Sequence, residues 1–219
     1  MAKVGVVLSG CGVFDGAEIH EAALTLLYLD KAGSQIICMA PDADQADVIN
    51  HMKGEAAGEK RNVLIESSRI ARGDIKNIKE VKAADLDALV FPGGFGAAKN
   101  LCSFALKGAD CTVNVDVERL VKEMHSAKKP IGFICIAPVI AARVLGSFHP
   151  QLTIGSDKDT ADAIEKMGGK HVASPVENIV VDQKNKIVTT PAYMLGPSIS
   201  KVARGIEKLI HEVLKMVSS

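Results

Sequence analysis

The chain has 219 residues but no tryptophan, and only 4% of its residues are aromatic. This scarcity argues against a surface that stacks nucleic-acid bases on aromatic rings. An excess of charge is missing as well, because 26 lysine and arginine residues balance 26 aspartate and glutamate residues. Nucleic-acid-binding domains usually carry a broad basic surface. We therefore expect no nucleic-acid partner.

Long apolar runs are also missing. The first run, Val4–Leu8, has the length of a buried strand and is too short for the apolar core of a signal peptide. No run approaches the roughly 20 residues that a membrane-spanning helix needs. We therefore expect no membrane partner and predict a cytoplasmic protein.

Paired cysteine motifs are absent, although the chain has five cysteines. Their number is odd and their spacings are wide, which argues against a disulfide framework and against a zinc site. Reduced thiols fit a reducing compartment. Because the sequence contains no motif that binds a metal or a cofactor, we expect neither.

What the sequence does contain is an alternation of apolar runs and amphipathic segments. Continuous apolar runs are typical of parallel strands that are covered on both faces. Such runs occur at residues 4–8, 35–40, 88–91 and 131–134. Apolar residues three and four apart predict helices, which we expect within residues 17–31, 117–124, 139–145 and 202–213. This order predicts an α/β fold with a mostly parallel sheet and helices on both faces.

Two segments depart from this alternation. Residues 41–73 are polar and charged, with a helix predicted at residues 62–71. A long excursion of this kind is often a binding loop or an oligomer contact. Residues 179–188 have a polar centre between two apolar ends, which predicts a β-hairpin. Since no linker or repeat divides the chain, we predict one domain over residues 1–219.

The strongest local feature is the end of the fourth predicted strand, where Cys135 is followed by small residues and a helix-forming stretch. This strand–turn–helix order is typical of a nucleophile elbow. A thiol at a helix N-terminus is favoured as the thiolate, its reactive form, by the helix dipole and by free amides. The alternative is a buried and unreactive cysteine.

A glycine-rich turn follows the third predicted strand. Gly93 and Gly94 allow close approach of the backbone, so that their amides, together with that of Ile136, can bind a substrate oxygen. Ligands of open α/β sheets bind at the carboxyl ends of the strands, where this turn and Cys135 would meet. Asn100, at the end of the turn, is a further candidate for substrate binding. The alternative is a tight turn that binds nothing.

A second glycine-rich loop follows the first predicted strand and brings Gly12 to the same edge of the sheet as another candidate for substrate binding. The helix after this loop begins with Glu18 and Glu21, and a carboxylate beside a thiol can exchange protons with it. Burial would raise the pKa of such a carboxyl. The alternative is that both glutamates are favourable charges in the first turn of a helix. The glycine spacing does not match a dinucleotide-binding fingerprint.

Four segments together resemble a known family, namely residues 8–21, 92–101, 135–138 and 188–194. They resemble the ElbB family, known as isoprenoid-biosynthesis or lycopene-enhancing proteins with an amidotransferase-like domain. That family belongs to the ThiJ/PfpI superfamily, which is related to class I glutamine amidotransferases. The similarity extends over nearly the whole chain. It implies a flavodoxin-like three-layer sandwich and a homodimer.

The resemblance also implies roles for individual residues. Cys135 occupies the elbow position of the superfamily, and the superfamily's partner glutamate lies on the first helix. Aligning residues 16–21 with the related pattern Gly-Ala-Glu-Glu-Met-Glu places that role on Glu21, with Glu18 as the alternative at a short offset. Family members similar to this chain have been assigned a cofactor-independent glyoxalase activity. This lyase reaction of the hydro-lyase type converts glyoxal, a small dicarbonyl compound, to glycolate.

The sequence departs from the superfamily at one position. Many members have a histidine that completes a triad, in several directly after the cysteine, whereas this chain has Ile136 there. Among its six histidines, we expect only His20 and His149 near the site. A glutaminase is therefore disfavoured, and an amidotransferase-like subunit linked to isoprenoid biosynthesis is the weaker alternative. The other alternative is a non-enzymatic redox sensor or interaction protein that uses the same thiol.

Overall fold

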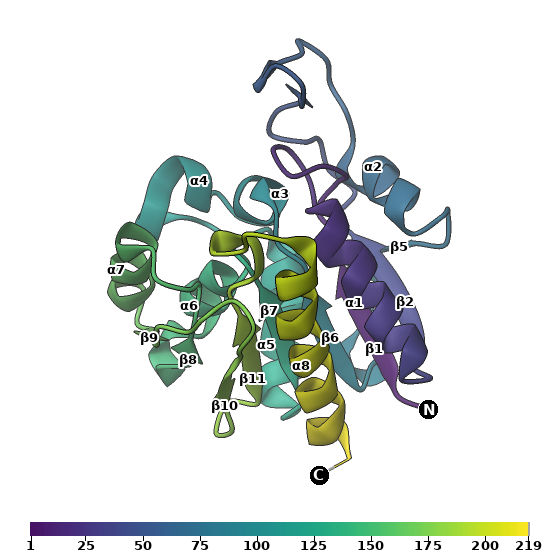
Figure 1. The fold of residues 1–219 in the computed structure, drawn as a ribbon. Helices are drawn as coiled ribbons and strands as arrows, with labels where there is room; N and C mark the ends of the chain where they lie inside the picture. The colour runs from purple at the N-terminus through teal and green to yellow at the C-terminus, as the bar shows by residue number, and fades with distance from the viewer. Residues whose placement is uncertain (219) are drawn as a thin grey trace.

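A seven-stranded sheet forms the centre of the computed structural model, which describes residues 1–218 (Figure 1). The strand order is β10-β11-β7-β6-β1-β2-β5, and every neighbouring pair is parallel except β10 with β11. The strands of this sheet are β1 (Lys3–Val7), β2 (Gln35–Ala40), β5 (Lys76–Asn77), β6 (Ala88–Phe91), β7 (Ile131–Ile134), β10 (Val180–Asp182) and β11 (Ile187–Thr190). The four apolar runs thus form strands as predicted, and β6 and β7 are buried at every residue.

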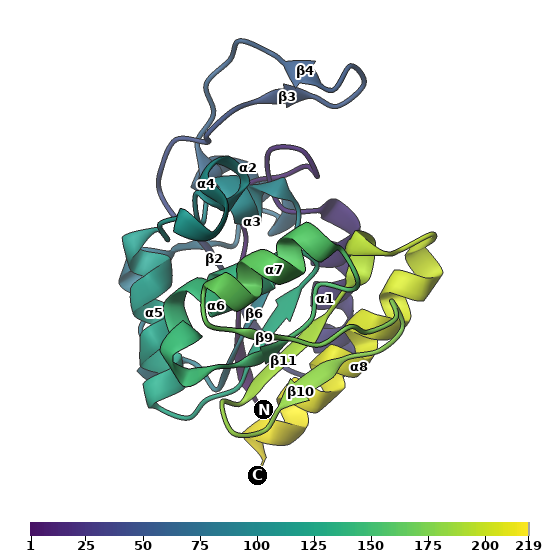
Figure 2. The same ribbon diagram turned by 90° about the vertical axis from the view of Figure 1, so that its left-hand side faces the viewer.

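Helices cover both faces of the sheet (Figures 1 and 2). On one face, α1 and α8 lie side by side against the sheet, and α2 packs at its edge; on the other face lie α5 and α6. The helices are α1 (Ile19–Lys31), α2 (Val63–Ile70), α3 (Phe95–Lys99), α4 (Phe104–Lys107), α5 (Val115–Ser126), α6 (Pro138–Leu145), α7 (Lys158–Lys166) and α8 (Ile199–Val217). The predicted three-layer α/β arrangement is confirmed.

An aromatic pair links the two central strands whose ends carry the site. Phe91 of β6 and Phe133 of β7 are paired in the sheet register. Their rings stack with centroids 4.9 Å apart, and both side chains are fully buried. An aromatic pair of this kind contributes on the order of 1 kcal/mol beyond its burial. The pair adds side-chain packing to the backbone pairing that joins the two strand ends.

The predicted excursion after β2 contains a small hairpin that stands away from the rest of the molecule in Figure 2. Its strands are β3 (Ile49–Asn50) and β4 (Glu55–Ala56). The predicted helix follows as α2, whose N-cap Asn62 accepts a hydrogen bond from the Ile65 amide at 3.0 Å. A role in ligand binding or oligomer contact stays a prediction.

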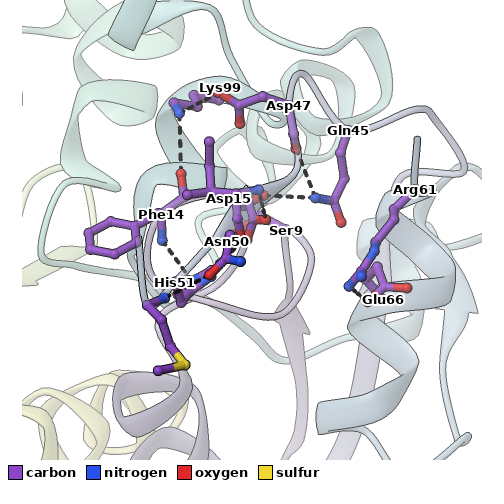
Figure 3. A network of polar contacts seen from close by, with 12 residues as sticks. Ser9, Phe14, Asp15, Gln45, Asp47, Asn50, His51, Arg61, Glu66 and Lys99 are labelled. Atoms are coloured by element: carbon purple, nitrogen blue, oxygen red, sulfur yellow. Dashed lines mark hydrogen bonds and ion pairs between the residues drawn. The ribbon is translucent and has the colours of Figure 1, made fainter. Parts of the chain in front are cut away.

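Polar contacts tie the base of this excursion to the loop after β1 (Figure 3). Lys99 donates to Asp47 at 2.7 Å and to the carbonyl oxygen of Phe14 at 3.2 Å. The Asp15 carboxylate accepts a hydrogen bond from the Ile49 amide at 2.7 Å. Ile49 of the excursion and Lys99 of α3 therefore hold the loop after β1 in place.

The predicted hairpin near the C-terminus is also confirmed, because β10 and β11 pair antiparallel across a short turn. A second small ladder, β8 (Gln151–Leu152) with β9 (Lys170–His171), lies beside α7. Between residues 1 and 218, no helix combines the length and the apolar character needed to cross a bilayer.

Candidate active site

The segments that follow β1, β6 and β7 converge at the carboxyl edge of the sheet. The Phe95 amide donates to the Val13 carbonyl oxygen at 2.8 Å, and the Glu18 amide donates to the Gly93 carbonyl oxygen at 2.9 Å. The loop after β1 is therefore bonded directly to the glycine turn after β6. Cys135 comes immediately after β7, the strand that pairs with β6. The structure thus brings together the three segments that the sequence singled out.

Cys135 has a strained backbone conformation. Its φ angle is 62°, in the left-handed region that residues other than glycine rarely adopt. Such a conformation costs on the order of 1–2 kcal/mol and is typical of functional sites. The Cys135 amide is anchored by a 2.9 Å hydrogen bond to the carbonyl oxygen of Thr190 at the end of β11. The turn therefore has the geometry of an elbow that presents the thiol at the strand end.

Glu21 lies against this thiol. Its side chain is fully buried in the first turn of α1 and forms a hydrogen bond with the Cys135 side chain. One carboxyl oxygen accepts from the Gly93 amide at 2.9 Å, and the other accepts from the Tyr193 amide at 3.2 Å. Three partners from three different segments therefore hold one carboxyl group in place.

Glu18 has a different position. It is the N-cap of α1, and its side chain accepts a hydrogen bond from the Glu21 amide at 2.7 Å. Capping a helix in this way satisfies one of its free amide groups. Of the two glutamates that the sequence left as alternatives, the structure places Glu21 against Cys135 and uses Glu18 to begin the helix.

Burial controls the ionisation of the pair. It raises the pKa of the Glu21 carboxyl to about 8, with a further contribution from the neighbouring Glu18 carboxylate. Hydrogen bonds from Tyr193, Cys135 and Gly93 lower this pKa without offsetting the burial. Glu21 is therefore protonated at neutral pH and can donate a hydrogen bond, unlike a solvent-exposed glutamate.

The electrostatics of Cys135 differ from the sequence expectation. Burial raises the pKa of the thiol well above its ordinary value, and the adjacent Glu21 carboxylate acts in the same direction. The amides of Gly94 and Ile136 donate hydrogen bonds to the sulfur and lower the pKa, but burial outweighs them. The expected thiolate at a helix N-terminus is therefore wrong for the resting site. Both the thiol and the carboxyl carry protons at neutral pH.

The glycine turn divides its two amides between two tasks. The amide of Gly93 is bonded to Glu21, whereas the amide of Gly94 points at the sulfur of Cys135. A side chain at Gly93 has no room, because its Cβ would lie 2.4 Å from the Cys135 Cβ and 2.7 Å from a Glu21 carboxyl oxygen. Gly94 and Ile136 are therefore the amides available to a substrate oxygen, and Gly93 acts through Glu21.

Gly12 and Asn100, the other two candidates for substrate binding, do not line the cavity beside Cys135. Asn100 uses its side-chain amide group on the carbonyl oxygens of Ser9 and Asp15, and its side-chain oxygen accepts from the Ala46 amide. Gly12 lies beneath the excursion, where a Cβ would meet the ring of His51 at 2.6 Å. Both residues shape the loop after β1 and leave no polar group for a ligand.

A cavity of about 300 Å³ lies against Cys135. Its apolar wall is formed by Val13, Phe95, Ala98, Phe104, Ala105 and Met194. Among the described residues, its polar side chains are those of Cys135, Glu18, Thr160 and Tyr193. A reactive thiol at one side of a mostly apolar pocket is the usual composition of a small-molecule site.

Tyr193 is a further site residue that was not expected from the sequence. Its amide holds Glu21, its ring lines the cavity, and its hydroxyl group lies 2.7 Å from His20 Nδ1. His20 is thus near the site, as expected, but reaches it only through Tyr193. His149 is not near it; its ring bonds the Gly168 carbonyl oxygen instead. The missed signal is that residues 191–193 directly follow β11, the strand beside β7.

A catalytic triad is not assembled, since no histidine among the described residues lines the cavity. Residues 1–218 also contain no group of three or more histidine, cysteine, aspartate or glutamate side chains arranged to hold a metal ion. The chemistry that the described side chains can perform is addition of a thiol to an electrophile, with a buried carboxyl group that gives and takes a proton.

Two mitochondrial proteins are similar to this chain over nearly its whole length. The ES1 protein homolog of Rattus norvegicus is 49% identical over 98% of this chain and 84% of that protein. The glutamine amidotransferase-like class 1 domain-containing protein 3 of Homo sapiens is 49% identical over 98% of this chain and 83% of that protein. The predicted cytoplasmic location is contradicted by these relatives. Composition and apolar runs describe the folded domain, whereas the compartment is encoded in separate targeting segments.

A solved structure and a family model are also similar to this chain over most of its length. An isoprenoid biosynthesis protein with an amidotransferase-like domain from Ehrlichia chaffeensis is 38% identical, with a TM-score of 0.92 and 99% of each chain covered. The family model for DJ-1/PfpI proteins matches residues 11–194, which include all three segments that form the site. Sequence, fold and site position agree, and the chain belongs to the DJ-1/PfpI family.

Proposed function

We propose that this protein is a cofactor-independent glyoxalase that converts glyoxal to glycolate through a covalent bond to Cys135. The observation that carries the proposal is the buried and protonated Glu21 carboxyl group, which is hydrogen-bonded to the Cys135 thiol beside a cavity. A glyoxalase needs a nucleophile and one group that moves a proton between adjacent carbons. The Cys135–Glu21 pair supplies both.

The first step forms the carbon–sulfur bond. After Glu21 loses its proton, its carboxylate takes the proton of the Cys135 thiol as the sulfur adds to one aldehyde carbon of glyoxal. The developing oxyanion lies within reach of the Gly94 and Ile136 amides, which already donate to the sulfur. The carboxyl group of Glu21 then gives its proton to this oxygen. The product is a hemithioacetal beside a Glu21 carboxylate.

The second step moves a hydrogen between the two carbons. The Glu21 carboxylate removes the proton from the carbon that carries the sulfur, which gives an enediol, and returns a proton to the neighbouring carbon. The result is a thioester of glycolate. Water hydrolyses the thioester and regenerates the thiol. The net reaction is glyoxal plus water to glycolate, in which one carbon is oxidised and the other is reduced without an external oxidant.

The test compares two cysteines with the same burial. Cys135→Ala should abolish glycolate formation from glyoxal, while Cys38→Ala should leave it unchanged, because Cys38 lies in the middle of β2 and outside the cavity. Glycolate is measured by chromatography, and thermal unfolding confirms that both variants fold. Equal glycolate production by wild type and Cys135→Ala would refute the proposal.

A redox sensor is the second candidate, because the Glu21 carboxyl and two amides would also hold the oxygens of an oxidised sulfur. The sensor, like the glyoxalase, reacts through the thiolate, and the raised pKa of Cys135 slows its reaction with peroxide. The pKa of Cys111 is lowered to about 7, with the neighbouring Cys102 thiol as the largest cause. We expect mild peroxide to oxidise Cys111 before Cys135, as measured by peptide mass. Preferential formation of a sulfinic acid at Cys135 would favour the sensor.

A further inference from the structure

The cavity beside Cys135 is larger and less polar than glyoxal requires. Glyoxal has four non-hydrogen atoms, two of them oxygen, and therefore no apolar substituent. The cavity has a volume of about 300 Å³. At roughly 30 Å³ for each water-sized group, it holds about ten non-hydrogen atoms. Room for about six atoms remains after glyoxal is placed against the sulfur.

The groups that act on the carbonyl and most of the apolar lining come from different segments, while Thr160 of α7 and Tyr193 add two polar side chains to the cavity. The groups that act on the carbonyl come from the ends of β6 and β7 and from α1. The side chains contributed by α3 and α4 are Phe95, Ala98, Phe104 and Ala105, all apolar. An apolar wall of this kind offers a small polar dialdehyde no hydrogen bond. It would instead bury a hydrocarbon group.

We propose that the preferred substrate is an α-oxoaldehyde whose ketone carbon carries an apolar chain of about four to six carbons, a proposal that rests on the glyoxalase function proposed above. The aldehyde carbon reacts with Cys135, and the chain lies against α3 and α4. Phe104 and Ala105 determine specificity, because both side chains line the apolar part of the cavity on α4.

The reaction balances without a further reactant. The aldehyde R–CO–CHO and water give the 2-hydroxy acid R–CH(OH)–COOH. The carbon–sulfur bond forms and is later hydrolysed; the aldehyde carbon is oxidised to a carboxylate and the ketone carbon is reduced to an alcohol. Because Glu21 returns its proton from one side, the product from a longer substrate should be a single enantiomer, whereas glycolate has no stereocentre.

The first experiment is a homologous series of substrates. Burying one methylene group should raise kcat/KM by about fourfold, so the value should increase from glyoxal to methylglyoxal, 2-oxohexanal and 2-oxooctanal. We expect 2-oxooctanal to exceed glyoxal at least tenfold, with one enantiomer of 2-hydroxyoctanoate as the product. Chiral chromatography of the product separates enzymatic turnover from the racemic background reaction.

The second experiment changes the wall in two opposite ways. Ala105→Phe fills the cavity, and Phe104→Ala removes part of its wall. Each should lower the ratio of kcat/KM for 2-oxooctanal to that for glyoxal at least tenfold, and the second variant decides the question if the first does not fold. Leu106→Ala is the matched control on the same helix, since Leu106 is 73% exposed and does not line the cavity; both substrates should keep their wild-type rates.

Two results would overturn the inference, and they differ in what they mean. If glyoxal is converted in a Cys135-dependent reaction but 2-oxooctanal is no better, or if neither wall variant changes the ratio, the apolar substrate is wrong and the glyoxalase remains. If no member of the series is converted in a Cys135-dependent reaction, both proposals fail.

Discussion

Cys38 lies in a strand of the central sheet and Cys135 directly follows one. Both are buried, but only Cys135 is proposed to react with a substrate. They are 8% and 7% exposed, and burial raises the pKa of each thiol, that of Cys38 to about 11. Burial and acidity therefore do not distinguish the two residues. The difference lies in the backbone and in the neighbouring polar groups.

Cys38 lies inside a strand, paired with Val6 of β1, and the charge of Asp74 raises the pKa of its thiol further. Cys135 lies one residue beyond a strand, with φ of 62°, a buried carboxyl group, two amides and a cavity around its sulfur. A nucleophile needs a group that can take and return a proton, and at the strand end the Glu21 carboxyl group is hydrogen-bonded to the thiol. The comparison teaches that chain position, more than burial, separates a reactive cysteine from a structural one.

The largest expected effect on kcat comes from removing the carboxyl group that distinguishes the surroundings of Cys135 from those of Cys38. Glu21→Gln keeps the shape of the side chain but removes the group that moves protons. General acid–base catalysis contributes typically 10²–10⁴-fold, so kcat for glyoxal should fall about 10³-fold. Glycolate formation measures the loss, and thermal unfolding checks the fold.

The matched control is another buried glutamate. Glu66 on α2 is 6% exposed and is paired with Arg69 at 2.8 Å, away from the cavity. Glu66→Gln should leave kcat unchanged. A Glu21→Gln enzyme with more than a tenth of the wild-type kcat would remove Glu21 from the proton transfers and leave the thiol without its distinguishing partner.

A second change disturbs the geometry around Cys135 without replacing Cys135 or Glu21. Gly93→Ala places a methyl group 2.4 Å from the Cys135 Cβ and 2.7 Å from a Glu21 carboxyl oxygen. The pair must separate, so kcat should fall about 100-fold, as small displacements in an active site do, and overpacking should cost about 1–3 kcal/mol of stability. Activity and denaturant unfolding measure the two effects. Gly33→Ala, where a Cβ meets nothing within 4 Å, should keep wild-type activity.

The fold was predictable from the sequence because its signals are local. Apolar runs of four to six residues and helical periodicity are properties of neighbouring residues, and the four predicted strands and the C-terminal hairpin form as expected. Cys135 and the glycine turn were found for the same reason, since each directly follows a strand. The compartment was not predictable, because the folded domain does not encode it.

The rest of the site depends on contacts between distant segments. The family resemblance favoured Glu21 over Glu18, but the residues alone left both open, because the amides of Gly93 and Tyr193 that converge on the Glu21 carboxyl group are 72 and 172 residues away in sequence. The sequence also favoured a thiolate at Cys135, since periodicity does not report how deeply burial penalises a charge. Asn100 looked like a ligand residue, although the loop after β1 uses all its polar groups.

The pH dependence of alkylation tests the difference between the Cys135 and Cys38 thiols. Below pH 8 the Cys135–Glu21 pair holds both protons, because burial raises the pKa of Glu21 to about 8. As the pH rises toward that value, the pair loses one proton, mainly from Glu21, and a minor fraction of this one-proton form keeps the proton on Glu21 and carries the Cys135 thiolate. The rate of alkylation by iodoacetamide should therefore increase about tenfold per pH unit and then level off. The rate at Cys38 should keep rising toward its pKa of about 11. Peptide mass spectrometry follows both sites in one sample. A Cys135 rate independent of pH between 6 and 8 would contradict a protonated pair.

The smallest expected effect concerns the polar edge of the cavity. Tyr193→Phe removes the hydroxyl group that lies 2.7 Å from His20 Nδ1 but keeps the backbone amide that holds Glu21. Because no proposed proton transfer passes through this hydroxyl, kcat should fall only about threefold, with a loss of about 1 kcal/mol of stability for one hydrogen bond. Tyr28→Phe is the control, since Tyr28 lies on α1 outside the cavity. A fall of 100-fold in kcat for Tyr193→Phe alone would add Tyr193 and His20 to the proton path, and Cys135 would then depend on more than a single carboxyl group.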